Sequence, residues 1–144
     1  MMFKYRTIFP WEGDVKMDKV VHFELPAGDA ERAQKFYKGI FDWNIFKYEG
    51  DMPYWIVRTV ECDDNNMPKE AGAINGGLFE KDAKQQISPI LVINVPDIDA
   101  YMKKIKEAGG SQTTEKTEIS NMGYYARFKD TEGNELGLWE DIKK

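Results

Sequence analysis

The two halves of the chain repeat one pattern of elements, and this repeat constrains the fold more than any other feature of the sequence. Shifted by 68 residues, from 22 to 90, the segment 20–40 falls on the segment 88–108. In both copies a short apolar segment precedes a stretch with apolar residues at i, i+3, i+7 and i+10. That spacing is typical of an amphipathic helix. An aspartate that suits an N-cap, Asp29 or Asp97, stands before each predicted helix.

Further segments with strand character follow each predicted helix. In the first half they read WNIFKYE, YWIVRTVE and AINGGLFE. In the second half a weaker segment at 111–118 precedes YYARFKD and NELGLWE, which are joined by the turn signal DTEG. With leading strands expected at 20–25 and 90–95, each half reads as one strand, one helix and three strands. We therefore predict an α+β fold built from two paired βαβββ modules.

The length of the chain suits one domain. A chain of 144 residues can bury a real core, but it is short for two independent domains. We expect a single domain over residues 1–144. Within it we expect an N-terminal extension at 1–16, a first module at 17–83 and a second module at 88–143.

Charge and cysteine content exclude several classes of function. The net charge is −5 and no block of Lys and Arg is present, which argues against a nucleic-acid partner. No apolar run approaches the roughly 20 residues that a membrane span needs, and the first residues lack the features of a secretory signal. A single cysteine, Cys62, cannot form an internal disulfide or a cysteine-built zinc site. We expect a cytoplasmic protein that binds neither nucleic acid nor a membrane.

Four parts of the sequence together resemble the vicinal oxygen chelate superfamily. They read HFELPAGDAERAQKFYKGIFDW, then YWIVRT followed by GAINGGLF, then VPDIDAYMKKIKEAGG, and finally MGYYARFKDTEGNELGLWE. This superfamily includes glyoxalase I, bleomycin resistance proteins and extradiol dioxygenases. Within it, the chain is most similar to small proteins described as predicted enzymes related to lactoylglutathione lyase. The resemblance covers about residues 18–141 and implies curved sheets that form a U-shaped cavity, and a homodimer.

The resemblance also implies a divalent cation in the cavity, held by the first and last strands of each module. Of the four ligand positions, only the first keeps a ligand, His22. The other three fall on Ile90, on Gly137, and on Gly76 or Gly77. Transition metals at catalytic sites usually need about three protein ligands. We therefore expect no cofactor and no metal-dependent glyoxalase I activity.

His22 and Glu24 are the candidate catalytic residues. Side chains alternate along a strand, so these two share a face, which in the family lines the cavity. We interpret them as an acid–base pair in which the carboxylate orients the imidazole. Two alternatives stay open: a buried or rim histidine with a hydrogen-bond partner, and a rearranged divalent-metal site of His22, Glu24 and Glu135. Glu140 is expected to point away from the cavity as an exposed carboxylate.

The same alternation predicts a set of residues that line the cavity. Apolar walls with a few polar groups are typical of a small-molecule site. Arg127 is the strongest polar candidate, because a guanidinium can bind a carboxylate or phosphate through two parallel hydrogen bonds. Its alternative is an ion pair with an acid on a neighbouring strand. The predicted ligand-binding residues are Tyr54, Arg58, Asn94, Arg127, Gly137 and Trp139, accompanied by Trp55, Ile90 and Val92. Of these, Tyr54, Trp55 and Arg58 come from a predicted strand whose phase the sequence does not fix.

Three functions fit these residues. The first is a lyase- or isomerase-type enzyme that acts on a small carbonyl or hydroxylated compound, through His22 or through a rearranged metal site. The second is a protein that sequesters a small organic ligand without a metal, as bleomycin resistance proteins do. The third is a dimerising sensor domain for a small molecule. The polar loop at 61–70 is either a lid over the cavity or a solvated connection.

Overall fold

The computed structural model describes residues 16–82 and 84–142. Except for Lys16, the predicted N-terminal extension lies outside the described residues. The first half contains β1 (Val20–Ala27), α1 (Ala30–Phe41), β2 (Asn44–Lys47), β3 (Tyr54–Arg58) and β4 (Gly76–Glu80). The second half contains β5 (Ile90–Asn94), α2 (Ile98–Glu107), β6 (Ser111–Gln112), β7 (Thr117–Ile119), β8 (Gly123–Lys129) and β9 (Glu135–Asp141).

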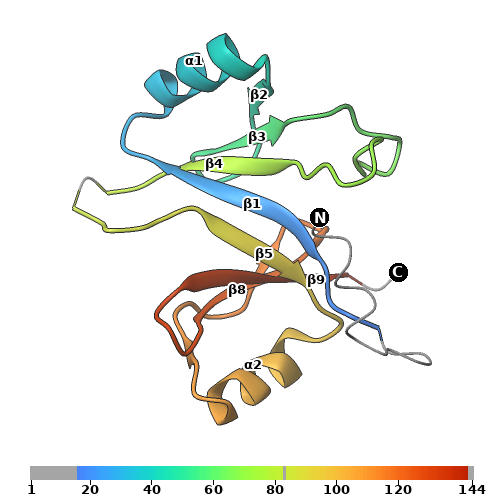
Figure 1. Ribbon diagram of the computed structural model, residues 1–144, viewed down its shortest axis with the longest axis vertical. Coiled ribbons are helices and arrows are strands. Elements are labelled where there is room, and N and C mark those ends of the chain that lie inside the picture. Colours follow the sequence, from blue (N-terminus) through green and yellow to red (C-terminus); the bar gives the residue numbers. More distant parts are fainter. Residues whose placement is uncertain (1–15, 83, 143–144) are drawn as a thin grey trace, which may run out of the picture.

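All described strands belong to one curved mixed sheet of nine strands, in the order β2-β3-β4-β1-β5-β9-β8-β6, with β7 also paired to β8. The first and last strands of each half are parallel neighbours, β1 with β4 and β5 with β9. The halves join where β1 and β5 pair antiparallel. Figure 1 shows the two helices at opposite ends, with β1 and β5 between them. The α+β fold of two paired modules is confirmed.

The second module departs from the predicted pattern in one respect. The weak segment at 111–118 forms two short strands, β6 and β7, instead of one. Both pair with β8, and the backbone N–H groups of Thr113 and Thr114 both donate to the carbonyl oxygen of Arg127 between them. Two residues therefore face one, as in a β-bulge. The bulge divides what would otherwise be one edge strand.

Both helices begin at the predicted N-caps. The Asp29 carboxylate accepts a hydrogen bond of 3.0 Å from the backbone N–H of Arg32, and Asp97 accepts one of 3.1 Å from Ala100. The second helix ends before Gly109, whose φ of 102° lies in the left-handed region that favours glycine. Neither of these helices is long and apolar enough to cross a membrane.

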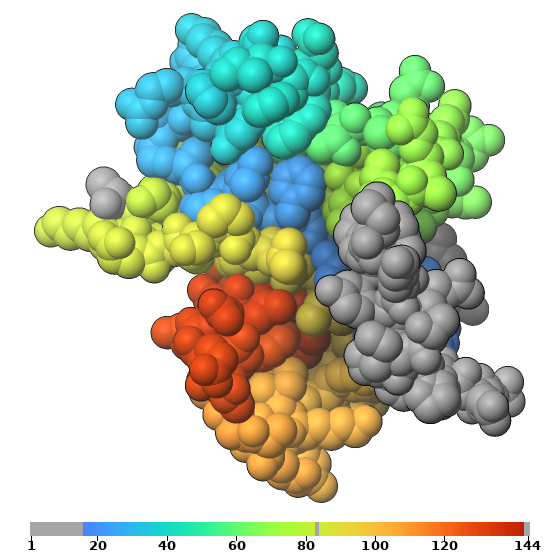
Figure 2. Space-filling view, in the orientation of Figure 1, coloured from blue at the N-terminus to red at the C-terminus, as the bar shows by residue number. Residues whose placement is uncertain are grey.

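Each helix covers a core of its own on one face of the sheet. Under α1 the most deeply buried side chains are those of Val57 and Leu78, both fully inaccessible. Under α2 they include Ala126 and Leu138. The space-filling view shows the two modules at opposite ends of the molecule (Figure 2). Because the helices cover one face, residues of alternate phase on the same strands share the other face, which we call the open face.

Candidate functional site

Strand register shows which positions of the two modules are equivalent. In the β1–β5 pair His22 lies opposite Val92, and Glu24 lies opposite Ile90. The sequence repeat makes His22 equivalent to Ile90 and Glu24 equivalent to Val92, so equivalent residues exchange places across the pair. A local twofold relation between the modules requires this exchange. The imidazole and the carboxylate therefore both come from the first module.

The outer strands continue this equivalence. Gly77 of β4 lies between Glu24 of β1 and Ile56 of β3. Gly137 of β9 holds the same place in the second module, with Arg127 of β8 beside it. β3 and β8 are each the third strand from the boundary between the modules. Ile56 on β3 therefore corresponds to Arg127 on β8.

Two tyrosines at equivalent positions lie over these glycines. Tyr54 stands two residues before Ile56, and Tyr125 two before Arg127. A Cβ added to Gly77 would lie 1.8 Å from the hydroxyl oxygen of Tyr54. A Cβ added to Gly137 would lie 2.9 Å from the ring of Tyr125. The tyrosine side chains therefore occupy the space where the resemblance placed metal ligands.

His22 is hydrogen-bonded to Tyr54 across the first module. The imidazole Nε2 lies 2.8 Å from the Tyr54 hydroxyl oxygen. Burial lowers the pKa of His22, and the Glu24 carboxylate opposes this only partly. Burial, with the same carboxylate, raises the pKa of Tyr54 above its ordinary value. Near neutral pH the phenol is therefore protonated and the imidazole neutral, and the imidazole tautomer decides which of the two donates the hydrogen bond.

Glu24 is the one buried charged side chain of the described residues, with 6% of its surface exposed. Its Oε1 accepts a hydrogen bond from the Tyr125 hydroxyl and lies 3.4 Å from Nη2 of Arg127. The Nε–H of Arg127 in turn donates to the Tyr125 hydroxyl oxygen over 2.8 Å. Burial, with the nearby Glu24 carboxylate, raises the pKa of Tyr125. Glu24 of the first module is thus bound by Tyr125 and Arg127 of the second module.

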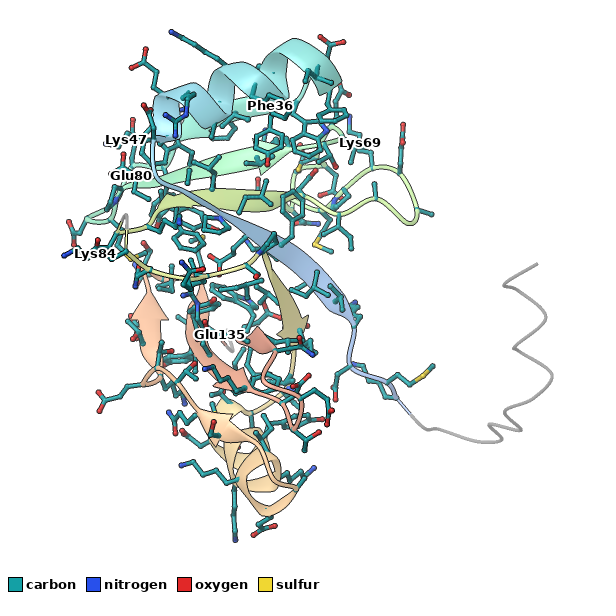
Figure 3. The ribbon with its side chains drawn as sticks, turned by 60° about the vertical axis from the view of Figure 1, so that its left-hand side comes forward. Phe36, Lys47, Lys69, Glu80, Lys84 and Glu135 are labelled. Atoms are coloured by element: carbon teal, nitrogen blue, oxygen red, sulfur yellow. The ribbon has the colours of Figure 1, made fainter. Side chains whose placement is uncertain are left out.

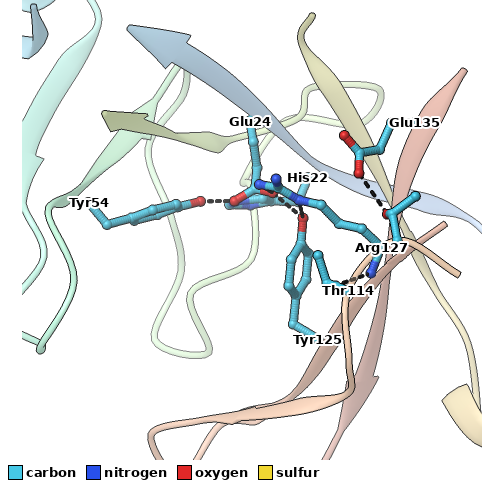
Figure 4. Close-up of polar contacts among 8 residues, drawn as sticks. His22, Glu24, Tyr54, Thr114, Tyr125, Arg127 and Glu135 are labelled. Atoms are coloured by element: carbon cyan, nitrogen blue, oxygen red, sulfur yellow. Dashed lines mark hydrogen bonds and ion pairs between the residues drawn. The ribbon is translucent and has the colours of Figure 1, made fainter. Parts of the chain in front are cut away.

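These five residues form what we call the His22–Glu24 cluster: His22, Glu24, Tyr54, Tyr125 and Arg127. Figure 4 shows them converging from strands of both modules. The predicted acid–base pair takes a different form, because the hydrogen bond of His22 runs to Tyr54 and those of Glu24 run to Tyr125 and Arg127.

Side chains bridge the two modules across the open face. The guanidinium of Arg127 lies 5.0 Å from the ring centre of Phe79 on β4. The hydroxyl groups of Tyr48 and Ser120, which belong to different modules, are hydrogen-bonded. Two hollows of the described surface, of about 340 and 580 Å³, lie elsewhere, at the start of α1 and at the end of β3.

The remaining predicted lining residues have different surroundings. Asn94 donates to the carbonyl oxygen of Trp139 and to the Asp141 carboxylate, and the Trp139 indole N–H also donates to Asp141. Trp55 packs against the core under α1, which is a correction to its predicted place on the open face. Arg58 shares the phase of Tyr54 but lines the hollow at the end of β3.

Two further buried positions belong to β5. Ile90 and Val92, predicted to line the cavity, are 0% and 2% exposed. They pair with Glu24 and His22 and so form the apolar floor beside the His22–Glu24 cluster.

The two glutamates of β9 serve structural contacts. Glu135 accepts a hydrogen bond of 2.6 Å from the Thr113 hydroxyl, at the strand edge. Glu140 accepts one of 2.7 Å from the backbone N–H of Ile98, in the first turn of α2. Glu140 does point away from the cluster, but its side chain is only 15% exposed. The expectation of an exposed carboxylate was wrong, because the first turn of a helix offers free N–H donors.

The donor set does not fit the divalent metal that the family implies. Within the described residues, no group of three or more His, Cys, Asp or Glu side chains gathers closely enough to hold a metal ion. The rearranged site of His22, Glu24 and Glu135 is therefore not formed. Hydrogen bonds with tyrosines already engage the imidazole and the carboxylate of the cluster.

Sequence reasoning missed Tyr125. The alternation that selected Arg127 also selects Tyr125, which stands two residues earlier on the same strand. Phe79, which lies under the Arg127 guanidinium, could have been found in the same way from its two-residue distance to Gly77.

Comparisons of sequence agree with this architecture. Residues 19–138 match the family described as the Glyoxalase/Bleomycin resistance protein/Dioxygenase superfamily. A "Glyoxylase-like domain-containing protein" of Didymella fabae is 28% identical over 113 residues, which cover 77% of this chain and 84% of that protein. The "Putative glyoxylase CFP32" of Mycobacterium tuberculosis (strain CDC 1551 / Oshkosh) is 24% identical over 130 residues. The match covers 81% of this chain but only 43% of that relative.

Solved structures share the fold at low sequence identity. Methylmalonyl-CoA epimerase from Mycobacterium tuberculosis superposes with a TM-score of 0.61 at 14% identity, over 86% of this chain and 88% of that one. Hypothetical protein BH1468 from Bacillus halodurans C-125 gives a TM-score of 0.63 at 15% identity, over 90% and 98%.

Proposed function

The chain belongs to the Glyoxalase/Bleomycin resistance protein/Dioxygenase superfamily, and from this premise we propose that it binds a small organic molecule at the His22–Glu24 cluster without a metal ion. The ligand class we propose is a carbonyl compound that carries an anionic group. As in the sequence prediction, we propose that the protein works as a homodimer, which light scattering of the purified protein would test.

One observation carries this proposal: both modules contribute polar side chains to a single buried point. Burying a carboxylate beside a guanidinium costs desolvation that apolar side chains of the same volume would avoid. Buried ionisable groups with perturbed pKa values gather at functional sites more often than elsewhere. The cluster is therefore better explained by binding than by stability.

The cluster offers complementary groups to such a ligand. A guanidinium has five N–H donors, and Arg127 uses its Nε–H for Tyr125 and one from Nη2 for Glu24. The others are suited to an anionic group. The Tyr54 hydroxyl, now directed at His22, can turn to donate to a carbonyl oxygen of the ligand.

Proton transfer at His22 is the reaction we propose, of the lyase or isomerase type. A neutral imidazole can accept a proton from the carbon next to a carbonyl group, and a phenol can stabilise the oxygen that gains charge. The lowered pKa of His22 keeps the imidazole in this accepting form at neutral pH.

The single histidine allows a direct test of binding. Because the chain has one His, an untagged protein gives one set of imidazole NMR signals, which can be followed against a panel of small keto and hydroxy acids. We expect saturable shifts for at least one compound. Tyr125→Phe removes the hydroxyl that holds the ligand-binding guanidinium of Arg127 in place, and it should weaken binding by about tenfold. Tyr124→Phe, the neighbour on the opposite face, is the matched control and should have no effect.

The reaction is tested on the same ligand in deuterated water. The wild type should incorporate deuterium at the carbon next to the carbonyl group, and His22→Asn should not. Binding that leaves the His22 signals unchanged would contradict the proposed site. Equal effects of Tyr125→Phe and Tyr124→Phe on binding would also contradict it. Binding without deuterium incorporation would leave a metal-free sequestering or sensor protein as the function.

A further inference from the structure

A second candidate site lies where β3 ends, apart from the His22–Glu24 cluster. The hollow there has a volume of about 580 Å³, within the range of small-molecule sites. Its walls come from the end of α1, from β2, from β3 and from the loop at 61–70. Figure 3 shows Lys69, one of the lining residues, at the α1 end of the molecule, well away from Glu135 of the second module.

Arg58 supplies the hollow with a positive charge that has no ion-pair partner among the residues that the structure describes. Its guanidinium carbon lies 5.2 Å from the ring centre of Phe46. Its Nε–H is shielded from solvent and has no hydrogen-bond acceptor among the described residues. The ion pairs of this part of the chain, at up to 4.0 Å, do not include Arg58. A buried N–H donor without an acceptor is uncommon in native proteins.

Two of the three charges at the rim form an ion pair. Lys69 and Glu61 form an ion pair of 3.7 Å, with both side chains largely exposed. Asp42, the residue that ends α1, is also exposed. Among the described residues, Arg58 is therefore the one lining cation outside an ion pair, and the exposed Asp42 carboxylate is the one lining anion outside one.

Asn75 fixes the wall of the hollow. Its Oδ1 accepts hydrogen bonds from the backbone N–H groups of Thr59, over 2.7 Å, and of Val60, over 3.1 Å. Its Nδ2 donates to Sγ of Cys62 over 3.1 Å. The backbone after β3 and the thiol are thus held in place by one amide side chain. A site with fixed walls binds without the entropic cost of ordering them.

We propose that this hollow binds a small organic anion, a carboxylate or a phosphate, through the Arg58 guanidinium. A guanidinium that lies over an aromatic ring keeps its N–H edge available for the two parallel hydrogen bonds that such anions accept. The loop at 61–70, for which a lid and a solvated connection were the alternatives above, contributes Glu61, Cys62 and Lys69 to one wall of this site. The inference stands independently of the function proposed for the His22–Glu24 cluster.

Cys62 provides a reporter, because it lines the hollow and is the only cysteine of the chain. Its alkylation by iodoacetate, an anion, is compared with that by iodoacetamide, which is neutral, by mass spectrometry of the intact protein. The ratio of the two rates cancels changes in thiol reactivity. We expect Arg58→Gln to lower this ratio by about fivefold, the effect of losing one charge interaction at contact distance in water. Inorganic phosphate, at ionic strength matched with chloride, should slow iodoacetate in the wild type but not in Arg58→Gln.

Two variants keep this test decisive. Arg58→Lys retains the charge and should keep a ratio near that of the wild type, which also covers the case in which Arg58→Gln fails to fold. Arg32→Gln removes the same charge from the surface of α1, outside the hollow, and should leave the ratio unchanged. An equal ratio in Arg58→Gln and the wild type would overturn the proposal. So would an equal decrease in Arg32→Gln and Arg58→Gln, or a lack of competition by phosphate.

Discussion

At equivalent positions the two modules carry opposite kinds of side chain. The leading strand of the first module has His22 and Glu24, where the second has isoleucine and valine. On β3 and β8 the apolar residue belongs to the first module, as Ile56, and the charged residue to the second, as Arg127. The acid and its basic partner thus come from different modules, and the His22–Glu24 cluster exists only where the two are joined.

The two modules are alike at the positions that determine how neighbouring strands pack. Gly77 and Gly137 hold equivalent places, as do Tyr54 and Tyr125 above them. Burial is also similar, since Glu24 is 6% exposed and its equivalent Val92 is 2% exposed. Duplication has kept the packing geometry while the chemistry of the two halves has diverged, and the following variants test that difference.

The largest effect is expected at the Arg127 position. Arg127→Met leaves the Glu24 carboxylate buried without its cation, which should lower the free energy of unfolding by about 3 kcal/mol. Ile56→Met changes the equivalent position of the first module and should cost less than about 1.5 kcal/mol, as a volume-conserving apolar substitution does. Urea unfolding at neutral pH measures both.

A double variant separates loss of the ion pair from damage to the fold. Glu24→Leu combined with Arg127→Met removes both charges and should recover most of the stability lost in Arg127→Met alone. If the double variant is as unstable as the sum of the two single variants, the buried pair is not the source of the effect.

The glycines should differ by a smaller amount. Gly77→Ala places a Cβ 1.8 Å from the Tyr54 hydroxyl oxygen, whereas in Gly137→Ala the nearest atom of Tyr125 is 2.9 Å away. Overpacking costs about 1–3 kcal/mol, and we expect Gly77→Ala to lie above Gly137→Ala in that range, measured as a shift in Tm. The displaced Tyr54 should also lose its hydrogen bond to His22. Equal effects of the two substitutions would contradict the tyrosine packing described here.

Stability should depend on pH through His22. Its pKa is lowered in the folded protein by burial, so the unfolded chain binds a proton more readily. The stabilisation is therefore complete above the unfolded-state pKa of about 6.5 and is lost as the pH falls below it toward the folded-state pKa. The slope can reach about 1.4 kcal/mol per pH unit. Asparagine does not titrate, and neither does Ile90 at the equivalent position of the second module. His22→Asn should therefore remove the pH dependence of the urea unfolding midpoint between about pH 6.5 and 5.

Much of the fold could be predicted from local patterns. The stripes of the two helices, the caps at Asp29 and Asp97 and the alternation of β1 all follow from single segments. The division of 111–118 could not be predicted in this way, because a bulge depends on how Thr113 and Thr114 meet a strand that comes later in the sequence.

The candidate site was predictable only in part. Alternation alone placed His22, Glu24 and Arg127 on one face, but it says nothing of which side chains meet across a curved sheet. The glycines illustrate this limit. Gly137 was predicted to be part of the ligand site, whereas the rings of Tyr54 and Tyr125 fill the space above Gly77 and Gly137 from neighbouring strands.

The most direct test of the central claim is the NMR titration of the His22 imidazole, with and without zinc. The account predicts a pKa below 6.5, because burial disfavours the charged form of the ring, and it predicts signals that equimolar zinc does not change. A pKa at or above 6.5, or zinc-induced shifts of the imidazole nitrogens, would show that the ring is exposed or is part of a metal site and would contradict the account.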